Sequence, residues 1–345
     1  HTPDAGTSFP AYQRHRRDTP GTASPGAFSE FAESVKGGKF AVVGHMRPDG
    51  DCIGSQVAMA YLLRKLGAAE VVCLNKNDVP FLYREFTCGE KFLNTEDFCD
   101  ESFEIVTVDC ADLKRTSDEL GRKFPVPFAC FDHHASNKPY ARLNIIEPSA
   151  SATGELLAGL MADAGIEFGD DVASALYVAL MMDTRQLTTS NTNLRAFEVA
   201  TFLVSKGADP ADISVKLYQR EKFGRMKLLA QFLQSLTMHY DGRVCIGLLK
   251  SGVYEKTGSS KEDSDGLVDY ARNIDGVEIA VLLEDLADGG VKGSLRSKRP
   301  EMQVNEIAAH FGGGGHFAAA GFNVKMSMDE FYPELLNIIG EHLKR

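Results

Sequence analysis

The sequence predicts an α/β protein: a mainly parallel sheet flanked by helices, joined by a helical linker to a smaller α/β domain with a mixed sheet. Between residues 39 and 182, short apolar runs alternate with segments of helical periodicity, which is typical of βαβ units. After residue 236 the pattern changes to closely spaced strands divided by short turns, which favours hairpins. A chain of 345 residues has room for two domains.

Composition limits the partners of the chain. Hydrophobic residues make up 43% and charged residues 25%, as in globular proteins, and no run approaches the roughly 18 apolar residues that a membrane helix needs. The net charge of −11 opposes binding to long nucleic acid, which takes broad basic surface, and favours a short substrate. Seven cysteines without a CxxC pair indicate reduced, buried thiols and a cytoplasmic location.

Four segments are expected along the chain. Residues 1–25, rich in Pro, Gly, Ser and Thr with one HRR cluster, predict a disordered tail. Residues 26–193 should form the larger domain. Residues 194–236 are expected to be a helical connector, and residues 237–345 the smaller domain.

The larger domain is expected to alternate strands and helices. Apolar, β-branched runs predict strands, and spacing near 3.6 predicts helices. The expected strands are 39–45, 70–75, 104–109 and 126–132, and the expected helices are 51–66, 153–165 and 170–182.

The smaller domain should begin with a hairpin in HYDGRVCIGLL (239–249), with its turn at Asp241-Gly242. Residues 277–285 and 291–297 predict two further strands, divided by the turn ADGG. In FGGGGHFAAAGF (311–322), the small residues after the glycines are expected to start a tightly packed helix. A last helix is expected over about residues 329–343.

Acidic and histidine side chains follow several predicted strands. His45, Asp49 and Asp51 follow the first, Asp109 the third and Asp132 the fourth. Each aspartate alone is explained as a helix cap or a strand-end residue. Together they would crowd the carboxyl edge of a parallel sheet, where like charges repel unless cations neutralise them.

Asp183 strengthens the prediction of a metal site. It follows the apolar run ALYVALMM, where an unpaired buried charge is costly. Carboxylate and imidazole ligands without a thiolate run suit Mn²⁺ or Mg²⁺ better than structural zinc. Two such ions, about 3.5–4 Å apart, can act on a phosphate ester, so the pattern predicts a two-metal phosphoesterase.

These strings resemble a known family. HMRPDGDCIGS (45–55), VDCAD (108–112), DHH (132–134) and MMDT (181–184), in this order, resemble the DHH phosphoesterases. GSLRS (293–297) and GGGGHFAAAG (312–321) resemble their DHH-associated C-terminal domain. The layout is similar to the bacterial nanoRNase (oligoribonuclease) and pAp phosphatase branch. This resemblance implies hydrolysis of short oligonucleotides to mononucleotides and of 3′-phosphoadenosine 5′-phosphate (pAp).

The resemblance also implies roles for individual residues. One ion would be held by His45, Asp49 and Asp109, and the other by Asp51, Asp109, His133 and Asp183, with Asp109 as the bridge. The catalytic residues would be Asp109, Asp132, which orients ligands, and His134, which lies near the scissile phosphate. Mn²⁺ is the expected ion, with Mg²⁺ or Co²⁺ as alternatives.

The segment after Asp183 departs from the family pattern. The family commonly has glycine there, followed by an aromatic residue, whereas this chain has Arg185-Gln186-Leu187. Arg185 is expected either to contact substrate phosphate or to fill the edge of the site.

The glycine-rich segment is expected to bind substrate. Glycines let backbone N–H groups converge on an anion, and His316 would add a donor, although glycine runs are also found as linkers. Arg296 and Ser297 end a strand and could bind a terminal phosphate, or form a solvated strand end. The predicted substrate-binding residues are Arg296, Ser297, Gly313, Gly314, Gly315, His316 and Arg185.

Short RNA or DNA oligonucleotides or nucleotides are therefore the expected partners, with neither long nucleic acid nor a membrane, and a homodimer stays open. Three alternatives remain: hydrolysis of pApA or a cyclic dinucleotide such as cyclic di-AMP, hydrolysis of pyrophosphate or polyphosphate, and non-catalytic nucleotide binding. The complete set of metal ligands counts against the last.

Overall fold

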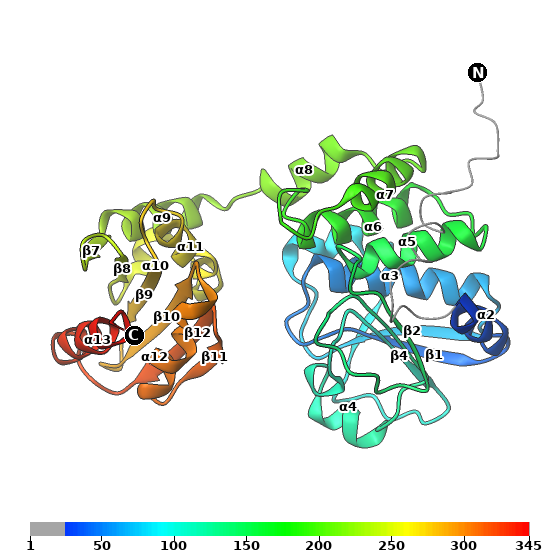
Figure 1. The fold of residues 1–345 in the computed structure, drawn as a ribbon, viewed down its shortest axis with the longest axis horizontal. Helices are drawn as coiled ribbons and strands as arrows, with labels where there is room; N and C mark the ends of the chain where they lie inside the picture. The colour runs from blue at the N-terminus through cyan, green and yellow to red at the C-terminus, as the bar shows by residue number, and fades with distance from the viewer. Residues whose placement is uncertain (1–24, 345) are drawn as a thin grey trace. The chain divides into compact units, whose positions relative to one another are not determined.

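A computed structural model describes residues 25–344 of the chain (Figure 1). They form two compact units, divided between Gln219 and Arg220. The tail predicted over residues 1–25 lies outside the described residues, except for residue 25, which begins the first helix. Every helix within residues 25–344 is too short or too polar to cross a lipid bilayer.

The first unit is built on a six-stranded parallel sheet with the order β3-β2-β1-β4-β5-β6. Four of its strands confirm the sequence prediction. The other two, β3 and β6, were not predicted, because they are only three and four residues long and have no clear apolar alternation. The strands are β1 (Lys39–Val43), β2 (Glu70–Asn75), β3 (Phe92–Asn94), β4 (Glu104–Val108), β5 (Ala129–Asp132) and β6 (Leu143–Ile146).

Helices cover both faces of this sheet (Figure 1). One face packs against a large core with α3, α5 and α6, and the other packs against α4 and a smaller aromatic cluster around Phe98 and Phe103. The helices of the unit are α2 (Pro25–Ser34), α3 (Gly50–Lys65), α4 (Asp118–Lys123), α5 (Thr153–Asp163), α6 (Asp170–Asp183), α7 (Leu194–Ser205) and α8 (Pro210–Tyr218), with short 3-10 helices η1 (Phe81–Phe86) and η2 (Leu113–Arg115).

The second unit contains a mixed six-stranded sheet with the order β11-β12-β10-β9-β8-β7. Only β8 and β9 run parallel to each other, and the other neighbours are antiparallel. The hairpin turn lies where the sequence predicted it, and Tyr240, Asp241 and Gly242 have positive φ there. The strands are β7 (Thr237–His239), β8 (Val244–Leu249), β9 (Ile279–Asp285), β10 (Val291–Ser297), β11 (Gly314–His316) and β12 (Ala319–Val324).

Two clusters of buried side chains pack on the two faces of this sheet. One includes residues of α12 and α13, and the other includes residues of α9 and α11. Of the helices in the predicted connector, α7 and α8 belong to the first unit and α9 to the second. The helices of the unit are α9 (Phe223–Gln234), α10 (Val253–Thr257), α11 (Leu267–Arg272), α12 (Val304–His310) and α13 (Met328–His342), with 3-10 helices η3 (Lys261–Ser264) and η4 (Pro300–Met302).

The prediction of a helix after the glycine run is wrong. Residues 319–324 form β12, which pairs with β10, and the glycines lead into β11 on its other side. A Cβ atom on Gly313 would lie 2.2 Å from the carbonyl oxygen of Gly321. The glycines therefore allow a close backbone approach within a hairpin, a role that local sequence does not distinguish from a helix start.

Helices α3 and α6 approach each other closely at Gly54. A Cβ atom there would lie 2.2 Å from the backbone oxygen of Ala175. We expect Gly54→Ala to lower the free energy of unfolding of the first unit by about 1–3 kcal/mol, because the added methyl group has no room. Urea unfolding followed by circular dichroism measures this change.

Gly121 in α4 is the matched control for this substitution. The nearest heavy atom to its added Cβ is 3.7 Å away, on Leu113. Gly121→Ala should leave the free energy of unfolding unchanged or raise it by up to about 1 kcal/mol. Equal destabilisation by both substitutions would contradict the packing argument.

Candidate metal centre

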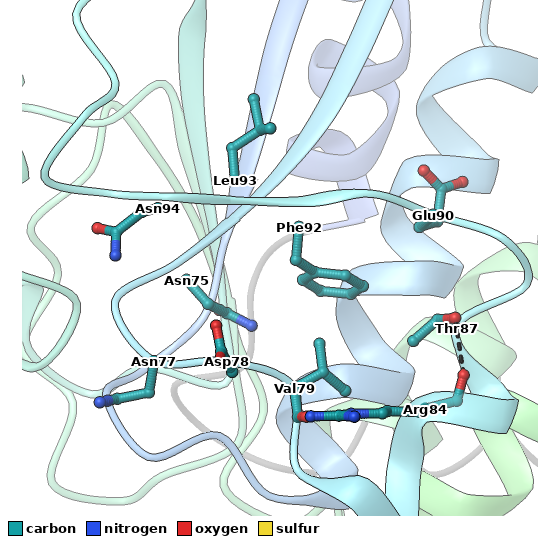
Figure 2. A pocket seen from close by; sticks show the side chains of 10 residues that line it. All are labelled: Asn75, Asn77, Asp78, Val79, Arg84, Thr87, Glu90, Phe92, Leu93 and Asn94. Carbon is teal, nitrogen blue, oxygen red and sulfur yellow. Dashed lines mark hydrogen bonds between the residues drawn. The ribbon is translucent and has the colours of Figure 1, made fainter.

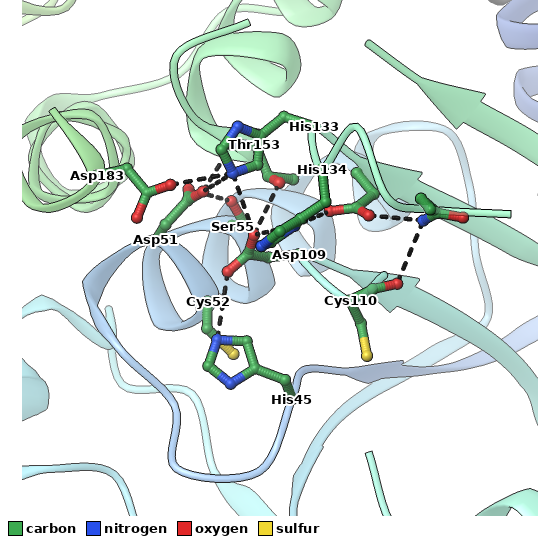
Figure 3. Close-up of polar contacts among 12 residues, drawn as sticks. His45, Asp51, Cys52, Ser55, Asp109, Cys110, His133, His134, Thr153 and Asp183 are labelled. Carbon is green, nitrogen blue, oxygen red and sulfur yellow. Dashed lines mark hydrogen bonds and ion pairs between the residues drawn. The ribbon is translucent and has the colours of Figure 1, made fainter. Parts of the chain in front are cut away.

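The predicted ligands lie together at the carboxyl edge of the first sheet, and Figure 3 shows five of them: His45, Asp51, Asp109, His133 and Asp183. The loop between β1 and α3 supplies His45 and Asp49, and the first turn of α3 supplies Asp51. Asp109 follows β4, His133 follows β5 and Asp183 ends α6. Parallel strands present their carboxyl ends at one edge, so residues far apart in sequence meet there.

These side chains belong to three overlapping potential ligand groups, the third being Asp109–His133–His134, and Asp109 and His133 each belong to two of them. His45 Nε2 lies 3.4 Å from Asp109 Oδ2 and 3.8 Å from Asp49 Oδ1. His133 Nε2 lies 3.0 Å from Asp183 Oδ2, 3.8 Å from Asp51 Oδ2 and 3.7 Å from Asp109 Oδ1. In each triad His45–Asp49–Asp109 and Asp51–His133–Asp183, the ligand atoms lie within 4.8 Å of one another. Asp109 faces both histidines.

Asp49 caps a helix and also belongs to a candidate ligand group. Its carboxylate accepts a hydrogen bond from the backbone N–H of Cys52 at 3.0 Å and so caps α3. The same oxygen lies 3.8 Å from His45 Nε2. The cap therefore fixes the orientation of a carboxylate at the centre.

Backbone carbonyls orient the two histidines. The Nδ1 atom of His45 lies 2.8 Å from the oxygen of Met46, and that of His133 lies 3.2 Å from the oxygen of Ala150. A carbonyl can only accept, so Nδ1 carries the proton and Nε2 faces the carboxylates. His133 Nε2 is buried and has no aligned hydrogen-bond partner among the described residues, which fits an atom that ligates a cation.

Asp51 is fully buried and held by the start of α5. Its carboxylate accepts hydrogen bonds from the backbone N–H groups of Thr153, at 2.7 Å, and Gly154, at 2.8 Å, and from the Ser55 hydroxyl at 3.1 Å. Burial, and then the charges of Asp109 and Asp183, raise the pKa of Asp51 well above its usual range. The helix N-terminus thus fixes this carboxylate without removing its repulsion from its neighbours.

The pKa values of the two histidines reflect the negative charge of the carboxylates around them. Burial alone would lower the pKa of His45, but the hydrogen bonds and charges of Asp109 and Asp49 raise it to about 10. Burial likewise opposes protonation of His133, and Asp183, Asp51 and Asp109 raise its pKa to about 10. Both imidazoles are therefore positively charged at neutral pH, with protons on both ring nitrogens, when only protein atoms are present. The buried, partly unpaired donor set fits divalent cations, which would replace these protons.

Asp132 and His134 form a hydrogen-bonded pair beside the ligands. His134 Nδ1 lies 2.7 Å from one oxygen of Asp132, and the Asn137 amide donates to the other at 2.6 Å. Burial opposes ionisation of Asp132, but these hydrogen bonds lower its pKa. His134 Nδ1 is also 3.7 Å from Asp109 Oδ1.

Three supporting residues were missed by the sequence analysis: Ser55, Asn137 and Thr153. The Thr153 hydroxyl donates to Asp109 Oδ1 at 3.1 Å, and Asp109 itself has a positive φ of 52°. A threonine at the start of a predicted helix was the available signal for Thr153. Nothing local distinguishes Ser55 or Asn137.

Arg185 lies in a left-handed turn after the last ligand. Arg185, Gln186 and Leu187 have φ values of 45°, 61° and 62°, a conformation that glycine adopts most easily. This gives a physical reason for the glycine expected after Asp183. The Arg185 side chain is exposed.

The predicted substrate residues of the second unit lie on β10 and β11, except Gly313, which directly precedes β11. Arg296 pairs with Ala319 on β12, and Ala319 pairs with His316 on β11. Directly paired residues share a face of the sheet, so Arg296 and His316 flank a small alanine on one face. Ser297 points to the opposite face, is buried, and its hydroxyl lies 3.3 Å from the carbonyl oxygen of Arg299. The sheet thus separates Ser297 from the other two.

The three glycines before His316 have different surroundings. A Cβ atom on Gly315, whose φ is 148°, would lie 2.5 Å from the oxygen of Ala319. Gly313 is confined in the same way by Gly321. Gly314 has open space around its Cα. Two of the three are therefore required by the hairpin itself.

Comparison with known proteins agrees with this two-unit arrangement. Residues 39–180 match the DHH family, N-terminal domain, and residues 243–345 match the DHHA1 domain. The first unit thus contains a region similar to the DHH N-terminal domain, and the second unit a region similar to the DHHA1 domain.

Two relatives and one solved structure are similar to this chain over most of its length. A Thermus thermophilus protein named bifunctional oligoribonuclease and PAP phosphatase NrnA is 27% identical over 318 residues, 92% of this chain and 94% of the relative. The Bacillus subtilis protein of the same name is 25% identical over 305 residues, 86% of this chain and 94% of its own. The crystal structure of an exopolyphosphatase-related protein from Bacteroides fragilis has a TM-score of 0.80 and 25% identity, over 94% of this chain and 97% of that one.

The histidine pKa values predict how stability depends on pH. A raised pKa stabilises the folded state below the unfolded value, near 6.5, and this stabilisation is lost as pH rises towards 10. The metal-free protein should therefore melt roughly 5 °C or more lower at pH 9.5 than at pH 6.5. Scanning calorimetry after chelation measures this difference.

Saturating Mn²⁺ should cancel the loss at pH 9.5, because metal ligands bind in their deprotonated forms. At about 100 times Kd, the ion would stabilise the fold by about 2.7 kcal/mol. The double variant His45→Gln, His133→Gln is the control, and its metal-free melting temperature should change less with pH. A wild-type profile that is flat without metal would contradict the charge argument.

Proposed function

We propose that this protein is a two-metal phosphoesterase that hydrolyses short oligonucleotides to mononucleotides and removes a phosphate from pAp. The observation that carries this proposal is the set of overlapping ligand groups around Asp109, which lies 3.4 Å from His45 Nε2 and 3.7 Å from His133 Nε2. The matches to the DHH and DHHA1 family models, and the names of relatives that align with 86–92% of the chain, support the substrate class.

Under this proposal, His45, Asp49 and Asp109 hold one ion, and Asp51, Asp109, His133 and Asp183 hold the other. Bound divalent ions supply an activated water and neutralise charge on the phosphate. Mn²⁺ is the proposed ion, because carboxylates and imidazoles form the whole donor set. Elemental analysis of protein purified without added metal tests the identity of the ion.

His134 is proposed to face the scissile phosphate. Its Nδ1–H donates to Asp132, which fixes the ring orientation and leaves Nε2 to act on substrate oxygen. Asn137 holds the other oxygen of Asp132. Asp132 is therefore proposed to position His134.

The second unit is proposed to bind the far phosphate of the substrate. Arg296 and His316 lie on one face of the sheet with only Ala319 between them in the register, so both can donate to a single anion. The glycines 313–315 keep the backbone near His316 uncovered by side chains. Ser297 is proposed to support the strand end through its buried hydroxyl, and Arg185 to lie at the edge of the metal centre. A cytoplasmic location and a homodimer stay predictions of the sequence.

Hydrolysis of pApA or cyclic di-AMP, or of pyrophosphate, uses the same centre and is the competing function. The purified protein with Mn²⁺ should be given pAp, a ribo-dinucleotide, a long RNA, cyclic di-AMP and pyrophosphate side by side. We expect the highest kcat/KM on pAp and the dinucleotide. Preference for pyrophosphate or long RNA would overturn the proposed substrate class.

Asp109→Ala should lower kcat on the dinucleotide by at least ~10³-fold, because both ligand groups lose their shared carboxylate. The matched control is Asp112→Ala, three residues on in the same string and exposed. Asp112 caps η2, so its loss should cost about 1 kcal/mol of stability and leave kcat unchanged. Wild-type turnover by Asp109→Ala would refute the metal assignment.

His316→Ala and Arg296→Ala should each raise KM for pAp about 10-fold or more, since a charge-assisted contact to phosphate is lost. Neither should change hydrolysis of bis-p-nitrophenyl phosphate, which lacks a far phosphate. Lys325→Ala, an exposed basic residue of the same unit, is the control for net charge. Equal losses on both substrates would remove these residues from the anchoring role.

A further inference from the structure

A cavity of about 340 Å³ opens in the first unit, at the carboxyl edge of the sheet (Figure 2). Its walls are the end of β2, the loop that follows, η1 and β3. Asn75, Asn77, Arg84, Glu90 and Phe92 are among the lining residues. None of them is a metal ligand in the proposed centre, so the cavity is a separate feature.

The Asn75 side chain lines this cavity with an unpaired carboxamide. It is 3% exposed, and neither its oxygen nor its nitrogen has a hydrogen-bond partner in the described part of the chain. Leaving such a group unpaired costs about 1–3 kcal/mol, and buried polar groups are nearly always paired. The nearby buried amide of Gln56, by contrast, donates to the oxygens of Val42 and Leu74, both at 3.0 Å.

The cavity has the chemistry of a nucleobase site. A carboxamide presents a donor beside an acceptor, which complements the edge of a base such as adenine. Figure 2 shows the Phe92 ring in the cavity wall near Asn75, and aromatic rings stack on bases. Asp78 and Glu90 outnumber Arg84 among the charged lining residues, so the cavity suits a neutral base better than a phosphate.

The cavity also lies close to the metal ligands. Strand β2 is the direct neighbour of β1, and adjacent strands are about 4.8 Å apart. The Asn77 side-chain oxygen accepts the backbone N–H of Arg47 at 2.9 Å, and Arg47 lies between His45 and Asp49. A base in the cavity is thus within one nucleotide of a phosphate at the centre.

We propose that this cavity binds the base of a nucleotide next to the scissile phosphate, with Asn75 pairing to its edge and Phe92 against its face. The inference rests on the proposed function for the identity of the substrate. It assigns base recognition to the catalytic unit, in addition to the phosphate anchor of the second unit.

Asn75→Leu tests the pairing, because leucine has a similar volume and no polar atoms. We expect KM for a ribo-dinucleotide to rise about 10-fold, with no change on bis-p-nitrophenyl phosphate, which has no base. The melting temperature should hold or rise, since an unpaired buried amide is removed. A loss of activity through misfolding would lower the melting temperature and affect both substrates.

Thr95→Val is the matched control. The Thr95 hydroxyl is also buried and unpaired, but Thr95 does not line the cavity. It should match Asn75→Leu in melting temperature and match the wild type in both KM values. An Asn75→Leu variant with wild-type KM for the dinucleotide would overturn the inference and mean that water alone fills the cavity.

Titration of metal-free protein with adenosine separates this inference from the proposed function. We expect millimolar binding by NMR chemical shift perturbation, lost in Asn75→Leu and kept in Thr95→Val. Adenosine should also compete with the dinucleotide and not with bis-p-nitrophenyl phosphate. Binding without competition would show a free nucleoside as the occupant and overturn the substrate-base assignment. If dinucleotides are hydrolysed and adenosine does not bind, only the cavity inference fails.

Discussion

Repulsion among the buried carboxylates at the edge of the first sheet is the constraint on which the rest of the site depends. Asp51 and Asp109 are almost completely buried. Together with Asp183, both lie within 4 Å of His133 Nε2. Such a cluster persists only if rigid donors hold each oxygen and cations offset the charge. The hydrogen bonds to Asp51 from the start of α5, and the one from the Thr153 hydroxyl to Asp109, provide the first condition. The second condition, that cations offset the negative charge, favours a divalent ion at this site.

Much of this site was predictable because each ligand has a fixed relation to its own strand or helix. A residue just after a buried parallel strand lies at the carboxyl edge whatever the remaining fold, so His45, Asp49 and Asp109 could be grouped from sequence. The supporting contacts were not predictable in this way. The hydrogen bond from Thr153 to Asp51 joins residues 102 positions apart, and its geometry depends on how α5 packs against α3. The short strands β3 and β6 similarly form because neighbouring strands offer them partners, not because of their own composition.

In the second unit, the main strands were predictable from the sequence, but the surroundings of the candidate substrate residues were not. Its main strands and its hairpin followed from apolar patterning, but the glycine-rich segment was misassigned. Small residues in a row are compatible with a helix start and with closely paired strands, and only the tertiary pairing of Gly314 with Gly321 decides between them. Pairing register then determines which side chains share a face. A shift of one residue between β10 and β12 would exchange Arg296 for Ser297 on the face of His316, so no pattern within β10 alone could rank the two.

The position of Asp183 at the end of α6 has a consequence for synthesis. The ligands span residues 45 to 183, and the last of them is also the last to leave the ribosome. A nascent chain that has emerged only as far as the Asp132-His133-His134 string already exposes acids and imidazoles, yet it cannot close the second ligand group. The candidate metal centre is therefore assembled only after most of the first unit has been translated and packed. Premature termination before α6 would yield a fragment that lacks Asp183 and so the complete set of candidate ligands.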